Sequence, residues 1–343
     1  MINKEIIVMT GGGTGGHLSI LKAIKTKLPY YKMVYIGSTT GQDKDWFEND
    51  PDFFRKYFLD TRGVFNQGFF GKIRSLAMFL NATREAIDIL KELNPKVIFS
   101  VGGYSSAPVA YAAKFLKIPL VIHEQNAVTG RLNQKLESYA THFISSYRED
   151  SPIKEYPIKE EFFIKRRVRK EIKCIFFVGG SQGAVAINNL ALSLAKELSN
   201  RGIKIIHQAG NNNIDKVKKE YEELGIHAKV FGYSTNISSY MNEADLAISR
   251  AGASTLWELS ANGLPAIFIP YPHAVGDHQY HNAKFLEDKD LAWIMREDEI
   301  DNDKILDIIL DNENISAKSE ALAKIIDSTG DIKIAQLLKE FLN

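Results

Sequence analysis

The stretch IIVMTGGGTGGHLSILKAIKTKL, from Ile6 to Leu28, contains the pattern that decides the fold of this chain. Its apolar start at residues 6–9 predicts a buried β-strand, the glycines within residues 11–16 predict a tight loop, and residues 18–28 predict a helix. Glycine allows the backbone to turn sharply and to approach a phosphate, while the start of the helix offers unpaired N–H groups. A strand, a glycine loop and a helix in this order indicate a Rossmann-like nucleotide-binding unit.

The same pattern begins again in the second half of the chain, at Cys174. A predicted strand over residues 175–178 leads into the glycine loop of residues 179–184, and a predicted helix over residues 187–198 follows. Further apolar runs predict strands at residues 33–36, 53–59, 96–101, 120–122, 203–206, 229–231, 246–248 and 264–270. Continuous apolar strands that alternate with helices are typical of a parallel sheet covered on both faces. The predicted fold class is therefore α/β, with two Rossmann-like, doubly wound domains.

The repeat places an N-terminal domain at residues 1–155 and a C-terminal domain at residues 165–328. The joint lies within residues 151–173 and contains the basic run 165–170, which we interpret as a solvent-exposed linker; the alternative is that one of its arginines lies near a phosphate. Residues 329–343 carry an amphipathic helical pattern. We expect this last helix to pack back onto the N-terminal domain.

Composition excludes several classes of protein. The 343 residues include 43 Lys and Arg against 42 Asp and Glu, so bulk nucleic-acid binding is not indicated and we expect no nucleic-acid partner. Cys174 is the single cysteine and permits no internal disulfide, which favours a reducing cytoplasm. No stretch approaches the roughly 20 apolar residues of a spanning helix, so we expect any membrane contact to be peripheral.

The first glycine loop leaves a nicotinamide-binding domain as the main alternative, because Gly11, Gly13 and Gly16 have the spacing of a dinucleotide fingerprint. That class places an acidic residue at the end of the second strand to hold a ribose, but here the strand ends at Gly37 and Ser38. A Walker loop is excluded because no Gly-Lys-Ser/Thr follows. His17 adds an imidazole that a plain cofactor loop does not need, and we expect no cofactor.

Polar residues follow several predicted strands, where parallel sheets bind their ligands. They lie at residues 123–126, 249–255, 270–273 and 277–282. A metal site is not indicated, because His273, His278 and His281 are irregularly spaced. We interpret the three Asp-x-Asp pairs as solvated charge; they are residues 43/45, 50/52 and 288/290.

These motifs together resemble the MurG family of UDP-N-acetylglucosamine transferases, which complete lipid II in peptidoglycan synthesis. The resemblance spans the chain, at residues 11–17, 102–104, 123–126, 179–184, 250–258 and 278–279 with Asn282. It implies a GT-B fold, in which two Rossmann-like domains face a central cleft. It also implies inverting transfer of N-acetylglucosamine from UDP-GlcNAc to the C4 hydroxyl of lipid I, at the cytoplasmic face of the bacterial cell membrane. A transferase that uses another lipid acceptor, such as diacylglycerol, is the alternative; an epimerase or a non-catalytic sugar-nucleotide binding module is more distant.

The resemblance also implies roles for individual residues. His17 is the first candidate for the general base, since imidazole ordinarily titrates near neutral pH, and Glu124 is the second. The implied donor-binding residues are Thr14, Gly15, Gly16, Asn126, Arg169, Ser181, Tyr233, Ser234, Ala251, Gly252, Ala253, Glu258, Gln279 and Asn282. The implied acceptor-binding residues are Gly13, Gly103, Tyr104 and His123. The family's Asn-Pro-Val-Arg element is here Arg-Arg-Val-Arg, which keeps only the final Val168-Arg169.

Aromatic and basic side chains alternate just before the long helical stretch of residues 72–93. Phe65, Phe69, Phe70, Lys72 and Arg74 form the candidate contact with an anionic membrane surface. The alternative is that this segment belongs to a helix that buries one face against the sheet.

Overall fold

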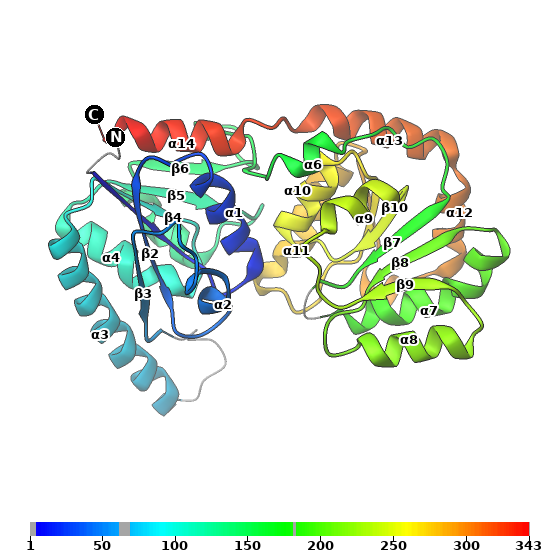
Figure 1. Cartoon of the computed structure of the whole chain (residues 1–343), viewed down its shortest axis with the longest axis horizontal. Coiled ribbons are helices and arrows are strands. Elements are labelled where there is room, and N and C mark those ends of the chain that lie inside the picture. Colours follow the sequence, from blue (N-terminus) through cyan, green and yellow to red (C-terminus); the bar gives the residue numbers. More distant parts are fainter. Residues whose placement is uncertain (1–4, 62–68, 181–182, 343) are drawn as a thin grey trace. The chain divides into compact units, whose positions relative to one another are not determined.

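The computed structural model describes residues 5–61, 69–180 and 183–342, with the backbone alone for residues 69–73. It divides the chain into two compact units (Figure 1). The first unit contains residues 1–158 and 329–343, and the second contains residues 159–328. The second unit therefore begins before the predicted residue 165, because the short helix α6 (Glu161–Ile164) packs on α10 (Ala253–Ala261) of the same unit.

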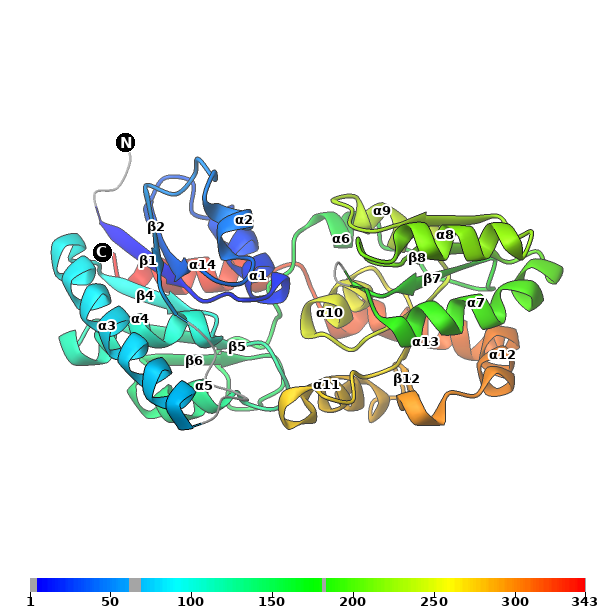
Figure 2. The same ribbon diagram turned by 90° about the horizontal axis from the view of Figure 1, so that it is seen from below.

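The first unit is built on a six-stranded parallel sheet with the strand order β3-β2-β1-β4-β5-β6. The strands are β1 (Ile6–Thr10), β2 (Lys32–Ser38), β3 (Arg55–Leu59), β4 (Val97–Ser100), β5 (Leu120–Glu124) and β6 (His142–Ser145). Its helices are α1 (Gly15–Lys25), α2 (Asp43–Phe47), α3 (Phe69–Leu93), α4 (Ala107–Leu116), α5 (Arg131–Leu136) and α14 (Gly330–Glu340). α3 packs beside α4, and their apolar faces enclose a core with alternate residues of the strands (Figure 2).

The second unit repeats this plan with the strand order β12-β11-β10-β7-β8-β9, again parallel throughout. The strands are β7 (Cys174–Val178), β8 (Lys204–Gln208), β9 (Ala228–Phe231), β10 (Leu246–Ser249), β11 (Ala266–Phe268) and β12 (Trp293–Ile294). The helices besides α6 and α10 are α7 (Val185–Asn200), α8 (Ile214–Glu223), α9 (Ile237–Glu243), α11 (His278–Glu287), α12 (Asn302–Leu310) and α13 (Asn312–Ile325). These two sheets confirm the predicted α/β class with two doubly wound domains.

Two strands were not predicted from the sequence, and both are short edge strands. β6 begins with His142 and has only four residues, while β12 has two. β6 lies in a short run that starts with a histidine. β12 lies within the five-residue apolar run 291–295, so its sequence signal was present and was missed. The predicted strands at the centre of each sheet are all present, because buried parallel strands have continuous apolar sequences.

The final helix belongs to the first unit, where α14 packs on α1. Asp331 at its first turn is buried and lies 3.6 Å from the Nζ of Lys27. Gly330 packs so tightly on the chain that a Cβ would come within 2.6 Å of the Tyr156 carbonyl oxygen. Among the described residues, no helix combines the length and apolar character needed to cross a membrane.

Candidate active site

Each sheet has one point at which the strand order reverses, and ligands of doubly wound sheets bind at such points. In the first sheet this point lies between β1 and β4, and in the second it lies between β7 and β10. The segments that follow these strands contain glycines; they are residues 11–14 and 101–104 in the first unit, and residues 179–180, 183–184 and 250–252 in the second. The predicted motifs therefore gather at the two expected positions.

The glycines of the first loop are required by packing within the protein. A Cβ on Gly11 would lie 2.5 Å from the Cγ2 of Val101. Gly13 has a φ of +83°, and its Cβ would lie 2.8 Å from the Tyr104 ring. Gly103 also leaves no room for a side chain, since its Cβ would lie 2.6 Å from the Gly12 carbonyl oxygen. The loops after β1 and β4 thus interlock, and each defines the shape of the other.

Asp43 holds the first loop from the other side and is fully buried. Its Oδ2 accepts a hydrogen bond from the Gly13 N–H at 2.6 Å, and its Oδ1 accepts from the Tyr35 hydroxyl at 2.9 Å and the Ser38 N–H at 3.0 Å. Burial, with the Asp43 carboxylate next in importance, raises the pKa of Tyr35 far above its ordinary value. The interpretation of Asp43 as solvated charge was wrong.

The other Asp-x-Asp pairs are partly structural as well. Asp50 and Asp52 both bind the buried Nζ of Lys25, whereas Asp45 and Asp288 are exposed. Within the described residues, no group of three or more His, Cys, Asp or Glu side chains is arranged to hold a metal ion.

His17 lies in the first turn of α1, after Gly15 and Gly16, and connects two segments of the first unit. Its Nδ1 lies 2.9 Å from the Oγ1 of Thr14, the residue that precedes the helix. Its Nε2 lies 2.9 Å from the Nε2 of Gln125, in the loop that follows β5. The imidazole is half-buried and is held at both ring nitrogens.

Glu124, the second candidate base, is buried at the end of β5 and organises the loop that follows. Its Oε1 accepts hydrogen bonds from the backbone N–H and the amide of Asn126, at 3.0 and 3.5 Å. Its Oε2 accepts from the Gly130 N–H and the Asn133 amide, both at 2.9 Å. Four donors thus surround the carboxylate, three from the loop after β5 and one from Asn133 on α5, and the bonds to Asn126 fix that residue in place.

His123 precedes Glu124 on the strand and is buried completely. Its ring meets the edge of the Tyr156 ring, with 5.5 Å between the centroids. Burial, with a smaller contribution from His17, lowers the pKa of His123 to about 3, so the ring is neutral. A fully buried side chain cannot contact an acceptor sugar from this position, and the predicted acceptor role of His123 is corrected on this ground.

The second unit has a different kind of glycine turn. α10 begins after Gly252, which is flanked by the buried Ala251 and Ala253. A Cβ placed on Gly252 would meet no heavy atom of the described residues within 4 Å, and the same holds for Gly180 after β7. The described residues therefore leave the Cβ positions of both glycines unfilled. Ser181 lies outside the described residues.

Glu258 lies in the second turn of α10 and is half-buried. Burial raises the pKa of Glu258 to about 8; Lys159 opposes this shift and Glu161 adds to it. Perturbed carboxyl groups of this kind are frequent at functional sites. Hydrogen-bond donors such as ribose hydroxyls would therefore stabilise the ionised form of Glu258, the residue predicted to bind the ribose.

The remaining predicted donor residues lie after β9 and on α11. Tyr233 is 55% exposed, and the Oγ of Ser234 accepts a hydrogen bond from the Asn236 N–H at 3.0 Å. The Oε1 of Gln279 accepts from the Tyr271 N–H at 3.0 Å. Asn282 is buried, and its Nδ2 donates to the Ala251 carbonyl at 3.2 Å, which ties α11 to the turn before α10.

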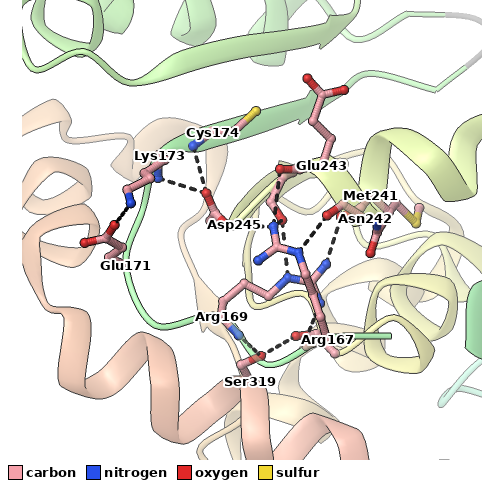
Figure 3. A network of polar contacts seen from close by, with 12 residues as sticks. Arg167, Arg169, Glu171, Lys173, Cys174, Met241, Asn242, Glu243, Asp245 and Ser319 are labelled. Atoms are coloured by element: carbon pink, nitrogen blue, oxygen red, sulfur yellow. Dashed lines mark hydrogen bonds and ion pairs between the residues drawn. The ribbon is translucent and has the colours of Figure 1, made fainter. Parts of the chain in front are cut away.

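Arg169 does not face an open site (Figure 3). Its side chain is fully buried, and its guanidinium donates to the carbonyls of Met241 at 2.9 Å, Ala244 at 3.2 Å and Arg167 at 2.7 Å. Asn262 receives two further hydrogen bonds, through its carbonyl and its Oδ1. The predicted contact between Arg169 and a diphosphate is corrected accordingly, because no N–H of the side chain remains for a ligand.

The rest of the basic run is also part of the second unit, and its interpretation as an exposed linker was wrong. Arg166 donates to the carbonyls of Ala261, Ala323 and Ile326. Arg167 binds the Asp245 carboxylate at 2.6 Å. A run of arginines can belong to an exposed linker or can donate to the free carbonyls at helix C-termini. The charge pattern is the same in both cases, so it could not distinguish these two roles.

The predicted membrane segment is only partly described. Phe65 lies outside the described residues, and the side chains of Phe69, Phe70 and Lys72 are not described either. Arg74 is exposed on α3, and the same helix exposes Leu76 by 58% and Leu80 by 49%.

Comparison with known proteins identifies the relatives of this chain. Residues 7–145 match the glycosyltransferase family 28 N-terminal domain, and residues 174–338 match the family's C-terminal domain. The chain is 61% identical, over 98% of both chains, to a UDP-N-acetylglucosamine--N-acetylmuramyl-(pentapeptide) pyrophosphoryl-undecaprenol N-acetylglucosamine transferase from Sulfurovum sp. (strain NBC37-1).

Among solved structures, one match belongs to the same family and others share only the fold. MurG from Acinetobacter baumannii is 26% identical, with a TM-score of 0.79 over 98% of this chain and 99% of that one. UDP-GlcNAc 2-epimerase from Neisseria meningitidis is 14% identical, with a TM-score of 0.61 over 98% and 99%, and shares the fold alone. The fold is thus the GT-B arrangement of glycosyltransferases, and this chain belongs to glycosyltransferase family 28 and, within it, to the MurG family.

Proposed function

We propose that this protein transfers N-acetylglucosamine from UDP-GlcNAc to the C4 hydroxyl of lipid I, which yields lipid II for peptidoglycan synthesis. The observation that carries the proposal is the match over almost the whole chain, at 61% identity, to a relative named for this transfer. The open turn before α10, with Glu258 on the same helix, gives the donor a fitting site.

The donor is proposed to bind the second unit. The turn of Ala251, Gly252 and Ala253 offers backbone N–H groups at the start of α10, where a diphosphate is favoured. Glu258 is proposed to accept the ribose hydroxyls, with the backbone near Tyr233 and Ser234 holding uracil. Gln279 is proposed to contact the sugar, and Ser181 remains a predicted ligand of the diphosphate. Asn282 acts in this scheme by holding the turn through its bond to Ala251.

The acceptor is proposed to bind the first unit, beside Gly13, Gly103, Tyr104 and Asn126. Inverting displacement requires a base for the acceptor hydroxyl and stabilisation of the negative charge on the departing diphosphate. We assign the base to His17, because the four donors around Glu124 commit that carboxylate to its own loop. Thr14, Gly15 and Gly16 position the imidazole at the start of α1.

Peripheral attachment to the cytoplasmic face of the membrane is proposed to use the exposed apolar side chains of α3 and α4. Leu76 and Leu80 are exposed on α3, and Phe115 at the end of α4 is 70% exposed. Lys114 and Arg74 supply positive charge nearby in sequence, which suits anionic lipid. Changing Leu76, Leu80 and Phe115 together to Ser is expected to abolish binding to anionic liposomes. Leu310→Ser, at a 52% exposed position of the second unit, is the control and keeps binding.

The transfer itself is tested with radiolabelled UDP-GlcNAc, with and without a short-chain lipid I analogue. Label that enters the lipid only when the analogue is present, with release of UDP, supports the proposal. Donor binding without transfer, followed by transfer to diacylglycerol, would replace lipid I by another lipid acceptor. The absence of donor binding would contradict the proposed function altogether.

A further inference from the structure

The Gln125 side chain makes a contact with His17 that constrains the protons of both groups. Gln125 is 7% exposed, and its Nε2 lies 2.9 Å from the Nε2 of His17. Its Oε1 is buried and has no hydrogen-bond partner among the described residues. A buried amide with only one of its two ends engaged is unusual in a folded protein.

The contact between the two nitrogens is a hydrogen bond in only one protonation state. An amide NH2 group donates and cannot accept, so the His17 Nε2 must be unprotonated, and a neutral ring then carries its proton on Nδ1. In this state the Nδ1–H donates to the Oγ1 of Thr14 at 2.9 Å. When Nε2 carries a proton, two N–H groups face each other and repel. Rotation of the amide by about 180° about its terminal bond replaces this repulsion by an Nε2–H···Oε1 hydrogen bond.

The two orientations of the amide differ in which imidazole nitrogen can act as a base. Thr14 is exposed, whereas Gln125 is buried, so the Nδ1 side of the ring is the side open to an acceptor. With the NH2 group toward the ring, Nδ1 is protonated and cannot take a proton. With Oε1 toward the ring, Nε2 holds the proton and Nδ1 is unprotonated. Nδ1 then accepts from the Thr14 hydroxyl, and an acceptor hydroxyl can take the place of that donor.

We propose that Gln125 is a positioning residue whose amide orientation selects the tautomer of His17 that can act as the base. The inference rests on the proposed function, in which His17 deprotonates the acceptor. The acceptor O–H proton moves to Nδ1 as the oxygen forms its bond to the anomeric carbon. The bond from that carbon to the diphosphate oxygen breaks, and its electron pair leaves with UDP. The resulting imidazolium still donates its Nε2–H to Gln125, and its new Nδ1–H can donate to the Oγ1 of Thr14 at 2.9 Å until Nδ1 returns the proton to solvent.

The other titratable groups near the ring do not compete for this role. His123 is buried and neutral, and its own ring nitrogens have no partner among the described residues. The Glu124 carboxylate is turned toward the loop of Asn126 and Gly130. The Gln125 amide lies 2.9 Å from the His17 Nε2.

The test is ¹⁵N NMR of the full-length protein labelled at histidine, with the His17 signals assigned by their loss in His17→Asn. Gln125→Glu can accept from Nε2–H but cannot donate, so the Nε2–H tautomer and a higher His17 pKa are expected. Gln125→Met removes both contacts, and its expected results are an altered tautomer ratio and a kcat at least about 10-fold lower, within the roughly 10²–10⁴-fold that a general base contributes. The KM for UDP-GlcNAc is expected to stay within about twofold of the wild-type value, because the substitution does not change the residues proposed to bind the donor. Gln134→Met, at an exposed position of α5, is the matched control and is expected to change none of these quantities.

The outcomes separate this inference from the proposed function. If the ¹⁵N shifts and the titration of His17 are the same in Gln125→Met, Gln125→Glu and wild type, the inference is overturned. If the tautomer changes as expected but transfer continues normally in His17→Ala, the amide does set the tautomer and His17 is not the base. A fall in kcat with unchanged His17 shifts also overturns the inference, because it would show a merely structural role for Gln125.

Discussion

Arg169→Met distinguishes between two roles of Arg169. The sequence motif implies a contact with the diphosphate, whereas the contacts in the structure indicate that Arg169 stabilises the second unit. The substitution keeps the length and most of the apolar volume of the side chain and removes its N–H donors. In the folded protein it removes the donor to the carbonyls of Met241, Arg167 and Asn262. The Ala244 carbonyl keeps a hydrogen bond from Arg167 at 2.9 Å. We expect the second unit to lose stability while the donor site is unaffected.

The size of this loss follows from the contacts. A buried acceptor that loses its partner costs roughly 1–3 kcal/mol, so three carbonyls give about 3–9 kcal/mol. Burial lowers the pKa of Arg169, which shows that the charge is held at a cost that methionine would recover in part. The expected net loss is therefore about 4 kcal/mol. This is a large share of a typical domain stability of roughly 5–15 kcal/mol.

Urea unfolding followed by tryptophan fluorescence measures this change, because Trp257 and Trp293, two of the three tryptophans, lie in the second unit. Calorimetric titration with UDP, at a temperature where the variant is folded, measures donor affinity separately. Arg201→Met is the matched control, since Arg201 forms an exposed ion pair with Glu197 that is worth about 0.5 kcal/mol or less. Unchanged stability together with a UDP affinity reduced tenfold or more would refute the structural role and restore the phosphate contact.

Three further predictions follow from single side chains. Asp43→Asn places an NH2 group against either the Gly13 N–H or the Ser38 N–H, because an amide has only one acceptor oxygen. We therefore expect kcat for transfer to fall by about 10-fold or more with UDP affinity intact, as for other supports of catalytic geometry. The exposed Asp45→Asn is the control, and equal activity of the two variants would contradict the role of Asp43. Because the pKa of Glu258 is raised to about 8, UDP affinity should increase as pH rises from 6.5 to 9, and Glu258→Gln should remove this dependence in calorimetric titrations. Burial lowers the pKa of His207 to about 4 against about 6.5 in the unfolded chain, so stability should fall as pH drops from 6.5 to 4, by up to about 3 kcal/mol. A pH-independent free energy of unfolding over that range would contradict the buried neutral imidazole.

The sequence predicted the two sheets because each central strand is a continuous apolar run that starts a repeated unit. It also placed most of the glycine turns, since their positions after β1, β4, β7 and before α10 follow from the strand pattern. Side-chain roles were harder to predict where one residue type serves two purposes. Arginine binds phosphates and also satisfies the carbonyls at helix ends, so Arg169 was assigned to a ligand although it holds its own domain together.

Two residues at the centre of the candidate site carried no sequence signal that could be used. Asp43 is one of several aspartates in a charged stretch, and only the fold brings it against Gly13, 30 positions earlier in the chain. Gln125 belongs to a polar motif in which its neighbours have more reactive side chains. The contact between Gln125 and His17 joins positions 108 residues apart in the sequence, and a local sequence pattern cannot predict a contact over such a separation.

The two halves of the chain begin with the same motif, and packing requires some of its glycines in both. A Cβ on Gly179 would lie 2.8 Å from the Gln208 carbonyl oxygen, and one on Gly183 would lie 2.5 Å from that of Ala209. The halves differ at other positions. In the first unit, a Cβ on Gly11 or Gly13 would collide with Val101 or Tyr104, so the space that glycine leaves is filled by the protein itself. In the second unit, a Cβ on Gly180 or Gly252 would meet no described heavy atom within 4 Å, so that space is open. The first loop is therefore a rigid support that orients His17, and it does not need a phosphate to define its shape. The second pair of turns keeps free the backbone surface that a diphosphate requires, which is why we assign the donor to the second unit and proton transfer to the first.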